Sequence, residues 1–317
     1  MVDGPAVSRS VHPEGTMTTI QQVHWKLEMD YLGHPYYVSG NAIFHALAHQ
    51  LPTTVRRTLR VSHGMFVPGQ YGTFPEDHSQ SGSHPAFGNS LREVQAYQDL
   101  FVFRDPYQPW LIESRPRDAL NTHDLRIQAG QPAMANKTIL NLPDANRFDT
   151  RTTNWFVSAY LSCPDESLLP LSRKVLDDVQ FGGKRNYGYG TATLVDSQLV
   201  DTTTLDYSAL EQADRFVIKL TTPFVLASTY PNADHQEVPW WWNQTRDELG
   251  ERTERIVEQR EVYRLTTVDH GQLVEYCGDR PVETAKQGIG RIGTHSKYGF
   301  GEFRVLPVER ADTVQAA

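Results

Sequence analysis

One pattern occurs twice in the chain and constrains its fold more than any other feature. Each copy reads apolar residue, Gly, five residues, Gly, aromatic residue, Gly, and the last of the five residues is Tyr in both copies. The copies are FGGKRNYGYG at 181–190 and IGTHSKYGFG at 292–301, an offset of 111 residues. Each copy follows a segment with helical patterning and precedes a strand-like segment. The repeat predicts two related units, each with a glycine-rich loop before its last strand.

Hydrophobic periodicity predicts the other elements of the two units. Alternating apolar and polar residues predict a strand at 23–31, and helical spacing predicts a helix over 41–50 that Ser39 caps and Pro52 stops. The rest of the first unit is predicted as strand 155–161, helix 168–179 and strand 191–195. The second unit is predicted as strand 216–228, a charge-rich helix over 245–259, strands 261–267 and 273–276, a short helix over 283–287 and strand 301–308.

The length of the chain and its local texture indicate two domains. The first is predicted over 19–205 and the second over 210–310. Residues 62–146 are dense in Gly, Pro, His, Ser and Gln, and we interpret them as a long insertion in the first domain. The ends, 1–18 and 311–317, have the composition of loose tails.

Charge and composition exclude several classes of protein. The net charge is −8, which argues against a generic polyanion binder, although three of the seven Lys lie in or just before the glycine-rich loops, at Lys184, Lys286 and Lys297. Two Cys exclude a disulfide framework and a Cys-based zinc cluster, and the His spacings are not those of a metal site. No run of 18 uncharged apolar residues is present, so we expect a cytoplasmic protein that neither spans a membrane nor binds a cofactor or metal.

Glycine-rich loops of this kind can bind anions. Glycines adopt positive φ and bring backbone N–H groups close to a ligand, where successive N–H groups form an anion-binding concavity. The cations in the loops add charge and the tyrosines offer rings for base stacking, so the loops suit a phosphodiester backbone. The candidate RNA-binding residues are Gly182, Lys184, Arg185, Tyr187, Gly188, Gly190, Arg291, Gly293, His295, Lys297, Tyr298, Gly299 and Gly301.

Other interpretations of the loops differ in strength. A pair of glycine-rich turns without a ligand remains an alternative. A dinucleotide-binding motif or a P-loop is excluded, because those motifs follow a strand and open a helix, whereas these loops follow a helix and open a strand.

The loops resemble the glycine-rich signature of the RAMP superfamily, the repeat-associated proteins of CRISPR systems. That signature reads Gly, apolar residue, Gly, five residues including a cation, Gly, apolar residue, Gly. Both loops match it, except that Gln180 and Arg291 replace its first Gly. The segments YYVSGNAIFHALA at 36–48 and TTPFVL at 221–226 resemble the openings of the two domains of these proteins, whereas the insertion at 62–146 resembles no known family.

The resemblance implies a fold and a function. The fold is α+β, with two tandem ferredoxin-like (RNA-recognition-motif-like) domains and a long insertion in the first. The leading function is a guide-RNA-binding subunit of an RNA-guided CRISPR effector complex in antiviral defence, and its partners are CRISPR RNA and other effector subunits. Two alternatives remain: a metal-independent endoribonuclease that processes repeat RNA to a 2′,3′-cyclic phosphate, and a scaffold subunit that binds no RNA. The acidic net charge is the main support for the scaffold.

Two histidines are candidate catalytic residues for the endoribonuclease alternative. His45 and His49 lie four residues apart on the predicted helix over 41–50 and therefore share a face, and histidine can accept or donate a proton near neutral pH. In the endoribonuclease branch of the superfamily a catalytic His lies near this helix. They could equally be ordinary, partly exposed helix residues, and neither has a partner visible in the sequence, which favours binding over cleavage.

One aromatic run has two interpretations as well. Trp240, Trp241 and Trp242 could stack on bases, or they could pack in a core or an interface. We favour packing.

Overall fold

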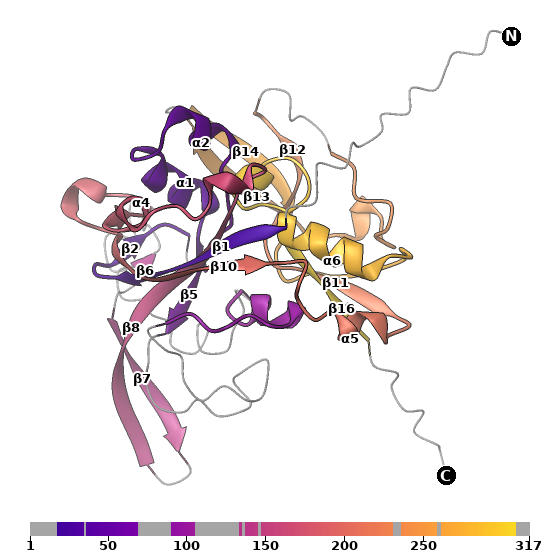
Figure 1. Ribbon diagram of the computed structural model, residues 1–317, viewed down its shortest axis with the longest axis horizontal. Helices are drawn as coiled ribbons and strands as arrows, with labels where there is room; N and C mark the ends of the chain where they lie inside the picture. Colours follow the sequence, from indigo (N-terminus) through magenta and orange to yellow (C-terminus); the bar gives the residue numbers. More distant parts are fainter. Residues whose placement is uncertain are drawn as a thin grey trace, which may run out of the picture.

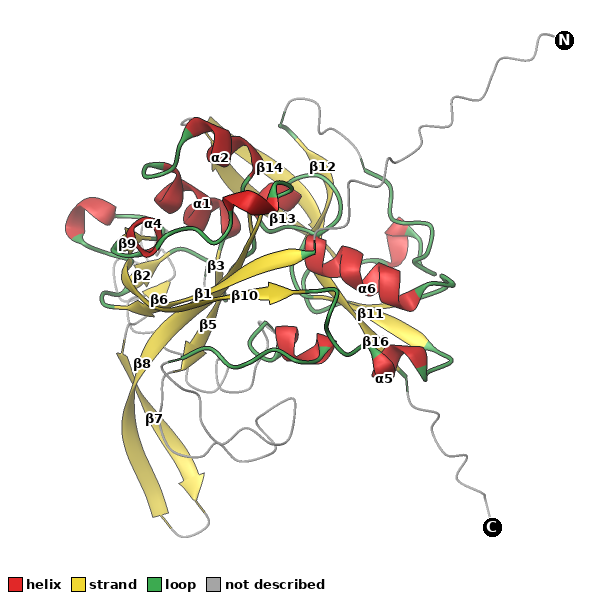
Figure 2. Cartoon of the chain, in the orientation of Figure 1, coloured by secondary structure: helices red, strands yellow, loops and turns green. Residues whose placement is uncertain are grey.

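The computed structural model describes residues 18–34, 36–68, 90–104, 133–134, 137–144, 147–230, 236–258 and 261–308. Over these residues the fold is mixed α/β and rich in strands, with short helices and mainly antiparallel strand pairing (Figures 1 and 2). The predicted α+β class is therefore confirmed. No helix in this part of the chain is long and apolar enough to cross a membrane.

The first half is built on a curved sheet with β1 at its centre. β1 (Thr19–Leu27) pairs antiparallel with β8 (Arg147–Ser162) on one side and with β10 (Thr191–Asp201) on the other. β5 (Gly64–Pro68) pairs with β8, so the order across the sheet is β3–β5–β8–β1–β10–β9. The edge strands are β3 (Tyr37–Val38) and β9 (Val179–Gln180). The C-terminal part of the predicted strand at 23–31 forms a separate short strand, β2 (Tyr31–Leu32).

Helices pack on one face of this sheet. α1 (Gly40–Ala48) begins at the predicted cap, because the Ser39 hydroxyl accepts a hydrogen bond from the Ala42 N–H at 3.3 Å. Its buried Leu47 packs in the same cluster as Trp25 of β1. Further along the chain come α2 (Thr53–Thr58) and β4 (Arg60–Val61), which pairs with β8.

The predicted helix over 168–179 is much shorter in the structure. Only α4 (Arg173–Leu176) is α-helical, and a 3-10 turn at Glu166–Leu168 precedes it. Pro170 lies inside the predicted helix. A proline has no N–H to donate within a helix, and its ring disfavours the helical conformation of the residue before it. Beyond α4, the Asp177 carboxylate accepts a hydrogen bond from the Leu194 N–H at 2.9 Å, which ties this segment to β10.

The second half contains two three-stranded sheets. The first strand of one sheet, β11, is followed in the chain by the first strand of the other, β12. Their orders are β15–β11–β16 and β12–β14–β13. The elements are β11 (Phe216–Leu220), β12 (Phe224–Ser228), β13 (Glu251–Glu258), β14 (Glu261–Val268), β15 (Leu273–Glu275), α6 (Pro281–Gly290) and β16 (Phe303–Pro307). The single strand predicted at 216–228 is interrupted at 221–223. Thr221 and Thr222 both donate their backbone N–H to the Glu302 carbonyl, and Pro223 has no N–H to donate.

The predicted helix over 245–259 is wrong, because residues 251–258 form β13. Burial along β13 alternates: Arg252, Glu254 and Ile256 are less exposed than the residues between them. This is the period of a strand, and Glu and Arg masked it because both are also good helix formers. A 3-10 turn at Arg246–Glu248 takes the place of the first turn of the predicted helix.

Both halves contribute to shared hydrophobic cores. One cluster joins Trp25 of β1 to Leu265 of β14 and to Phe300 of the second glycine-rich loop. The other joins Ile20 of β1 to Ile218 of β11. The described halves therefore pack through apolar side chains, and the domain boundary between 205 and 210 stays a prediction.

Only part of the predicted insertion lies within the described residues. Its start, 64–68, is β5 and belongs to the sheet, and Tyr97–Phe101 forms a 3-10 helix whose apolar side chains enter the second core cluster. β7 (Lys137–Asp144) pairs with the first half of β8, and the two strands project from the body as a two-stranded arm (Figure 1).

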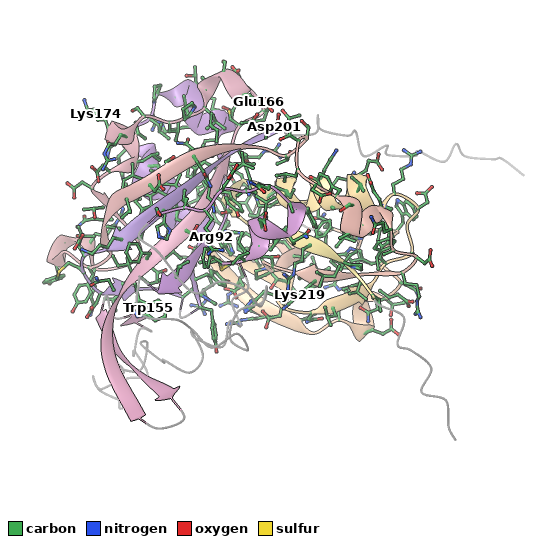
Figure 3. All side chains as sticks on the ribbon, turned by 60° about the horizontal axis from the view of Figure 1, so that its bottom comes forward. Arg92, Trp155, Glu166, Lys174, Asp201 and Lys219 are labelled. Carbon is green, nitrogen blue, oxygen red and sulfur yellow. The ribbon has the colours of Figure 1, made fainter. Side chains whose placement is uncertain are left out.

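At the opposite end of the sheet, Glu166 and Asp201 lie close to one another beside the start of β1 (Figure 3). There the Glu166 carboxylate accepts hydrogen bonds from Thr19.

Candidate nucleic-acid interface

The two glycine-rich loops have the same backbone conformation. In each loop, four equivalent residues have positive φ, and the residues between the second and third of them form a 3-10 turn, at Arg185–Tyr187 and at Ser296–Tyr298. The positive φ values are 76°, 53°, 82° and 72° at Gly182, Lys184, Gly188 and Gly190, and 85°, 65°, 94° and 79° at Gly293, His295, Gly299 and Gly301. Three of the four positions are Gly in each loop because Gly adopts positive φ at no steric cost.

Each loop is closed by an equivalent hydrogen bond. The Phe181 N–H donates to the Gly190 carbonyl at 2.9 Å, and the Ile292 N–H donates to the Gly301 carbonyl at 3.0 Å. A Cβ added at Gly190 or at Gly301 would overlap the carbonyl oxygen of Phe181 or Ile292, so the last glycine of each loop is required by close approach. The duplicated sequence pattern is thus a duplicated structure.

The loops also have equivalent positions in their own halves. The Gly190 N–H donates to the Asp30 carbonyl at 2.8 Å, just after β1, and the Gly301 N–H donates to the Pro223 carbonyl at 2.9 Å, just after β11. Each loop is therefore hydrogen-bonded to the segment that follows the first strand of its half, and the last strand of that half begins directly after the loop.

The first loop presents its polar side chains to solvent. Lys184, Arg185 and Asn186 are exposed, and Tyr187 is 75% exposed. A Cβ at Gly188 would meet no atom within 4 Å. The loop thus offers two cations and an aromatic ring on an open surface, a combination that suits a nucleic-acid strand.

The second loop is packed against the first half. Tyr298 is 6% exposed and Phe300 is 3% exposed. The Tyr298 carbonyl lies so close to Gly40 that a Cβ there would overlap it, which explains the glycine at the start of α1. Lys297 is half-buried, with its ammonium 4.5 Å from the ring centroid of Phe44.

Arg291 supports the second loop from inside. Its Nε donates to the Ser296 carbonyl at 3.1 Å and its Nη2 donates to the Ser162 hydroxyl at 2.9 Å. Burial lowers the pKa of Arg291 to about 10. The side chain is 5% exposed, so we leave Arg291 out of the contact surface and assign it to holding the loop.

α1 contacts the turn of the second loop and β9, the short strand that precedes the first loop, and it carries the candidate histidines. His45 is partly buried and its Nε2 lies 3.1 Å from the Val257 carbonyl of β13, whereas His49 is exposed at the end of the helix. Burial lowers the pKa of His45, the Val257 carbonyl and Glu258 raise it, and the charge of Arg185 lowers it. Arg185 of the first loop is therefore close enough to influence His45. We call the set Lys184, Arg185, Tyr187, His45, His49 and Lys297 the loop–helix surface.

Two residues of this region had no sequence signal. Glu258 accepts a hydrogen bond from the Tyr298 hydroxyl at 2.8 Å. The pKa of Tyr230 is raised mainly by burial and, to a smaller degree, by the charge of Glu258. Glu258 was concealed because it fell within the predicted charge-rich helix. Its position at the end of β13, beside α1, follows only from the tertiary fold.

The remaining candidates lie elsewhere. Trp241 and Trp242 are buried in the second core cluster, as favoured, whereas Trp240 is 76% exposed. Lys286 lies on α6, with its ammonium 5.1 Å from the ring centroid of Tyr207. Within the described ranges, no cluster of three or more His, Cys, Asp or Glu has an arrangement that could hold a metal ion.

Comparisons with known proteins give distant likenesses among solved structures alone. No protein-family model matches the sequence, and no curated protein does. Among solved structures, the chain is similar to one in the cryo-EM structure of the Type III-B Cmr-beta bound to cognate target RNA, with a TM-score of 0.30 and 9% identity. The match covers 80% of this chain and 86% of that one. A likeness this distant does not establish a shared fold.

Proposed function

We propose that the protein is a guide-RNA-binding subunit of a CRISPR effector complex, of the RAMP type, and that it binds RNA through the loop–helix surface. The observation that carries this proposal is the duplicated loop: two loops with the same backbone, at equivalent places in the two halves. Backbone N–H groups and cations contact phosphates without reading sequence, which suits a subunit that must hold any guide.

A tandem ferredoxin-like fold is part of the proposal, and the strand order supports it. In such a unit the four main strands lie in the order fourth, first, third, second, all antiparallel to their neighbours. The first half has this order as β10–β1–β8–β5. In the second half the order is divided between the two sheets. β16 takes the place of the fourth strand, β11 and β12 together that of the first, β14 and β15 that of the third, and β13 that of the second. The second half departs from the pattern because its described residues between β12 and β13 contain no α-helix.

Binding of a guide-length RNA as a function of salt tests the function. An RNA-binding protein that neutralises phosphates loses affinity linearly in log salt, whereas a scaffold that binds no RNA has no affinity to lose. We expect a negative slope for the wild-type protein despite its net charge of −8. Absence of RNA binding at low salt would favour the scaffold alternative.

The endoribonuclease remains a second candidate because of the environment of His45. Its lowered pKa keeps the imidazole neutral at pH 7, the form that can take the proton from a ribose 2′-hydroxyl, and Arg185 and Lys297 lie on the same surface to bind the phosphate. The 2′-oxygen would attack the phosphorus, the P–O5′ bond would break, and the leaving 5′-oxygen would take a proton from water, giving a 2′,3′-cyclic phosphate and a 5′-hydroxyl. Against this role, Nε2 of His45 already contacts the Val257 carbonyl.

Incubation with a repeat RNA without metal distinguishes the two candidates. We expect the RNA to be bound and not cut. Cutting that is abolished in His45→Ala, while RNA affinity is kept, would make the endoribonuclease the function, since a general base contributes roughly 10²- to 10⁴-fold to the rate. A substrate with a 2′-deoxy group at the cut site is the matching control, because it lacks the nucleophile.

A further inference from the structure

The second loop surrounds one carboxylate with groups that normally bind anions. The Tyr298 hydroxyl donates to Glu258 at 2.8 Å. Lys297, His295 and His45 all lie close enough for the charge of Glu258 to raise their pKa values against the opposing effect of burial. The same carboxylate raises the pKa of Tyr230, after the larger effect of burial. One ammonium, two imidazoles and two hydroxyls thus converge on Glu258.

The carboxylate does not fit this environment completely. Its second oxygen, Oε2, is buried and has no hydrogen-bond partner, and Nδ1 of the neighbouring His295 is buried without a partner as well. A buried polar atom without a partner is destabilising, so exchange of the carboxylate for a ligand that uses these donors would relieve part of that penalty. A phosphodiester has the same charge as the carboxylate and has two free oxygens.

We propose that the second loop is an anion site filled by the protein's own Glu258, and that a phosphodiester of bound RNA displaces this carboxylate from Lys297 and Tyr298. This inference rests on the proposed function, because the displacing ligand is RNA. Glu258 lies at the end of β13, next to residues 259–260, which are outside the described part of the chain, so it stands at a strand end and not in the middle of the sheet. In the absence of RNA the carboxylate compensates the charge of Lys297 and limits non-specific binding at this loop.

The test is Glu258→Gln. Glutamine keeps an acceptor for the Tyr298 hydroxyl and removes the charge that competes with the phosphate. We expect the affinity for a single-stranded RNA to rise roughly three- to tenfold at low salt, the range that a partly buried charge pair gives. The salt slope should become steeper by up to about one unit, because no displaced carboxylate takes up a cation when the RNA binds. Glu251→Gln, at the exposed start of the same strand, is the matched control for net charge and should leave the affinity unchanged.

A double-mutant cycle assigns the gain to this site. Lys297→Ala should remove the gain of Glu258→Gln while it changes the wild-type affinity much less. Equal affinities of wild-type and Glu258→Gln protein, or a gain that persists without Lys297, would overturn the inference and leave the proposed function standing. If neither wild-type nor Glu258→Gln protein binds RNA, both proposals fail.

A second measurement uses the unmodified protein. RNA that displaces Glu258 must contact Lys297, so bound RNA should protect the Lys297 amine from acylation by an amine-reactive label, read by mass spectrometry. Lys286, on α6 beside Tyr207, serves as the internal reference. Protection of Lys297 beyond that of Lys286 supports the displacement. Equal labelling of Lys297 with and without saturating RNA contradicts it, even if Glu258→Gln does not fold.

Discussion

The two glycine-rich loops share a backbone and differ in nearly everything around it. The first exposes Tyr187 to 75%, and the second buries the equivalent Tyr298 to 6%. Each loop has one residue with positive φ that is not Gly. In the first loop it is Lys184, which is exposed to solvent, and in the second it is His295, which is partly buried beside Tyr230. The repeated motif therefore determines the backbone conformation of a loop, and the packing around the loop determines whether its side chains are accessible to a ligand.

The largest expected effect is on stability and comes from one glycine position in the two loops. Gly188 and Gly299 have similar φ, but a Cβ at Gly188 meets open space and a Cβ at Gly299 would overlap His63. We expect Gly188→Val to destabilise the protein by about 1–2 kcal/mol through backbone strain alone. Gly299→Val should cost about 3–5 kcal/mol, because overpacking adds to the strain. Urea unfolding curves measure both, and equal losses would contradict the difference in packing.

Acid should destabilise the surroundings of the second loop. His63 is fully buried against Gly299, and burial holds its pKa well below the ordinary value; burial likewise lowers the pKa of His34 to about 3. When the pH falls below about 6.5, the unfolded chain takes up protons that these folded imidazoles refuse. Stability therefore falls with pH, by up to about 1.4 kcal/mol per pH unit for each such histidine.

The dependence of the unfolding midpoint on pH checks this prediction. His63→Gln should lower stability at pH 7 but flatten the loss between pH 6.5 and 4. His49→Gln, at the exposed end of α1, is the matched control for the substitution and should leave the unfolding midpoint at pH 7 nearly unchanged. A wild-type protein whose stability does not change over this interval would show that these histidines titrate normally.

A smaller effect concerns RNA binding by the cations of the two loops. Lys184→Ala with Arg185→Ala should flatten the salt slope by about two units, because two exposed phosphate contacts are lost. Lys297→Ala should flatten it by about one unit or less, because that ammonium is half-buried and faces Glu258. Unfolding midpoints of the variants provide the control for folding. A larger loss for Lys297→Ala than for the double variant would reverse the roles of the loops.

Local sequence rules predicted the elements that local geometry determines. Ser39 capped α1 as expected, and the spacing of the glycines predicted both loops, because positive φ and close backbone approach leave few alternatives to Gly. The rules failed where tertiary packing decides. The charged residues of β13 suit either a helix or an exposed strand, and only pairing with β14 selects the strand.

The candidate site shows the same division. The sequence named Arg185, His45 and Lys297 separately. The fold brings Arg185 close enough to affect the pKa of His45 and packs Lys297 on Phe44 of α1, which no local pattern could indicate. Burial separates two other candidates, Arg291 and Tyr298, from solvent. Arg291 bonds to Ser162, which lies 129 residues away in the chain, so its structural role depends on a contact that spacing does not reveal.

We propose that the exposed first loop meets RNA directly, whereas the second loop is largely enclosed. Ultraviolet cross-linking of bound single-stranded RNA, followed by mass spectrometry of the cross-linked peptides, tests it most directly, because stacked aromatic rings cross-link to bases. We predict cross-links at Tyr187 and few or none at Tyr298, and we predict that Lys184→Ala with Arg185→Ala removes them. Cross-links that map to Tyr298, or to neither loop while RNA is bound, would contradict the claim.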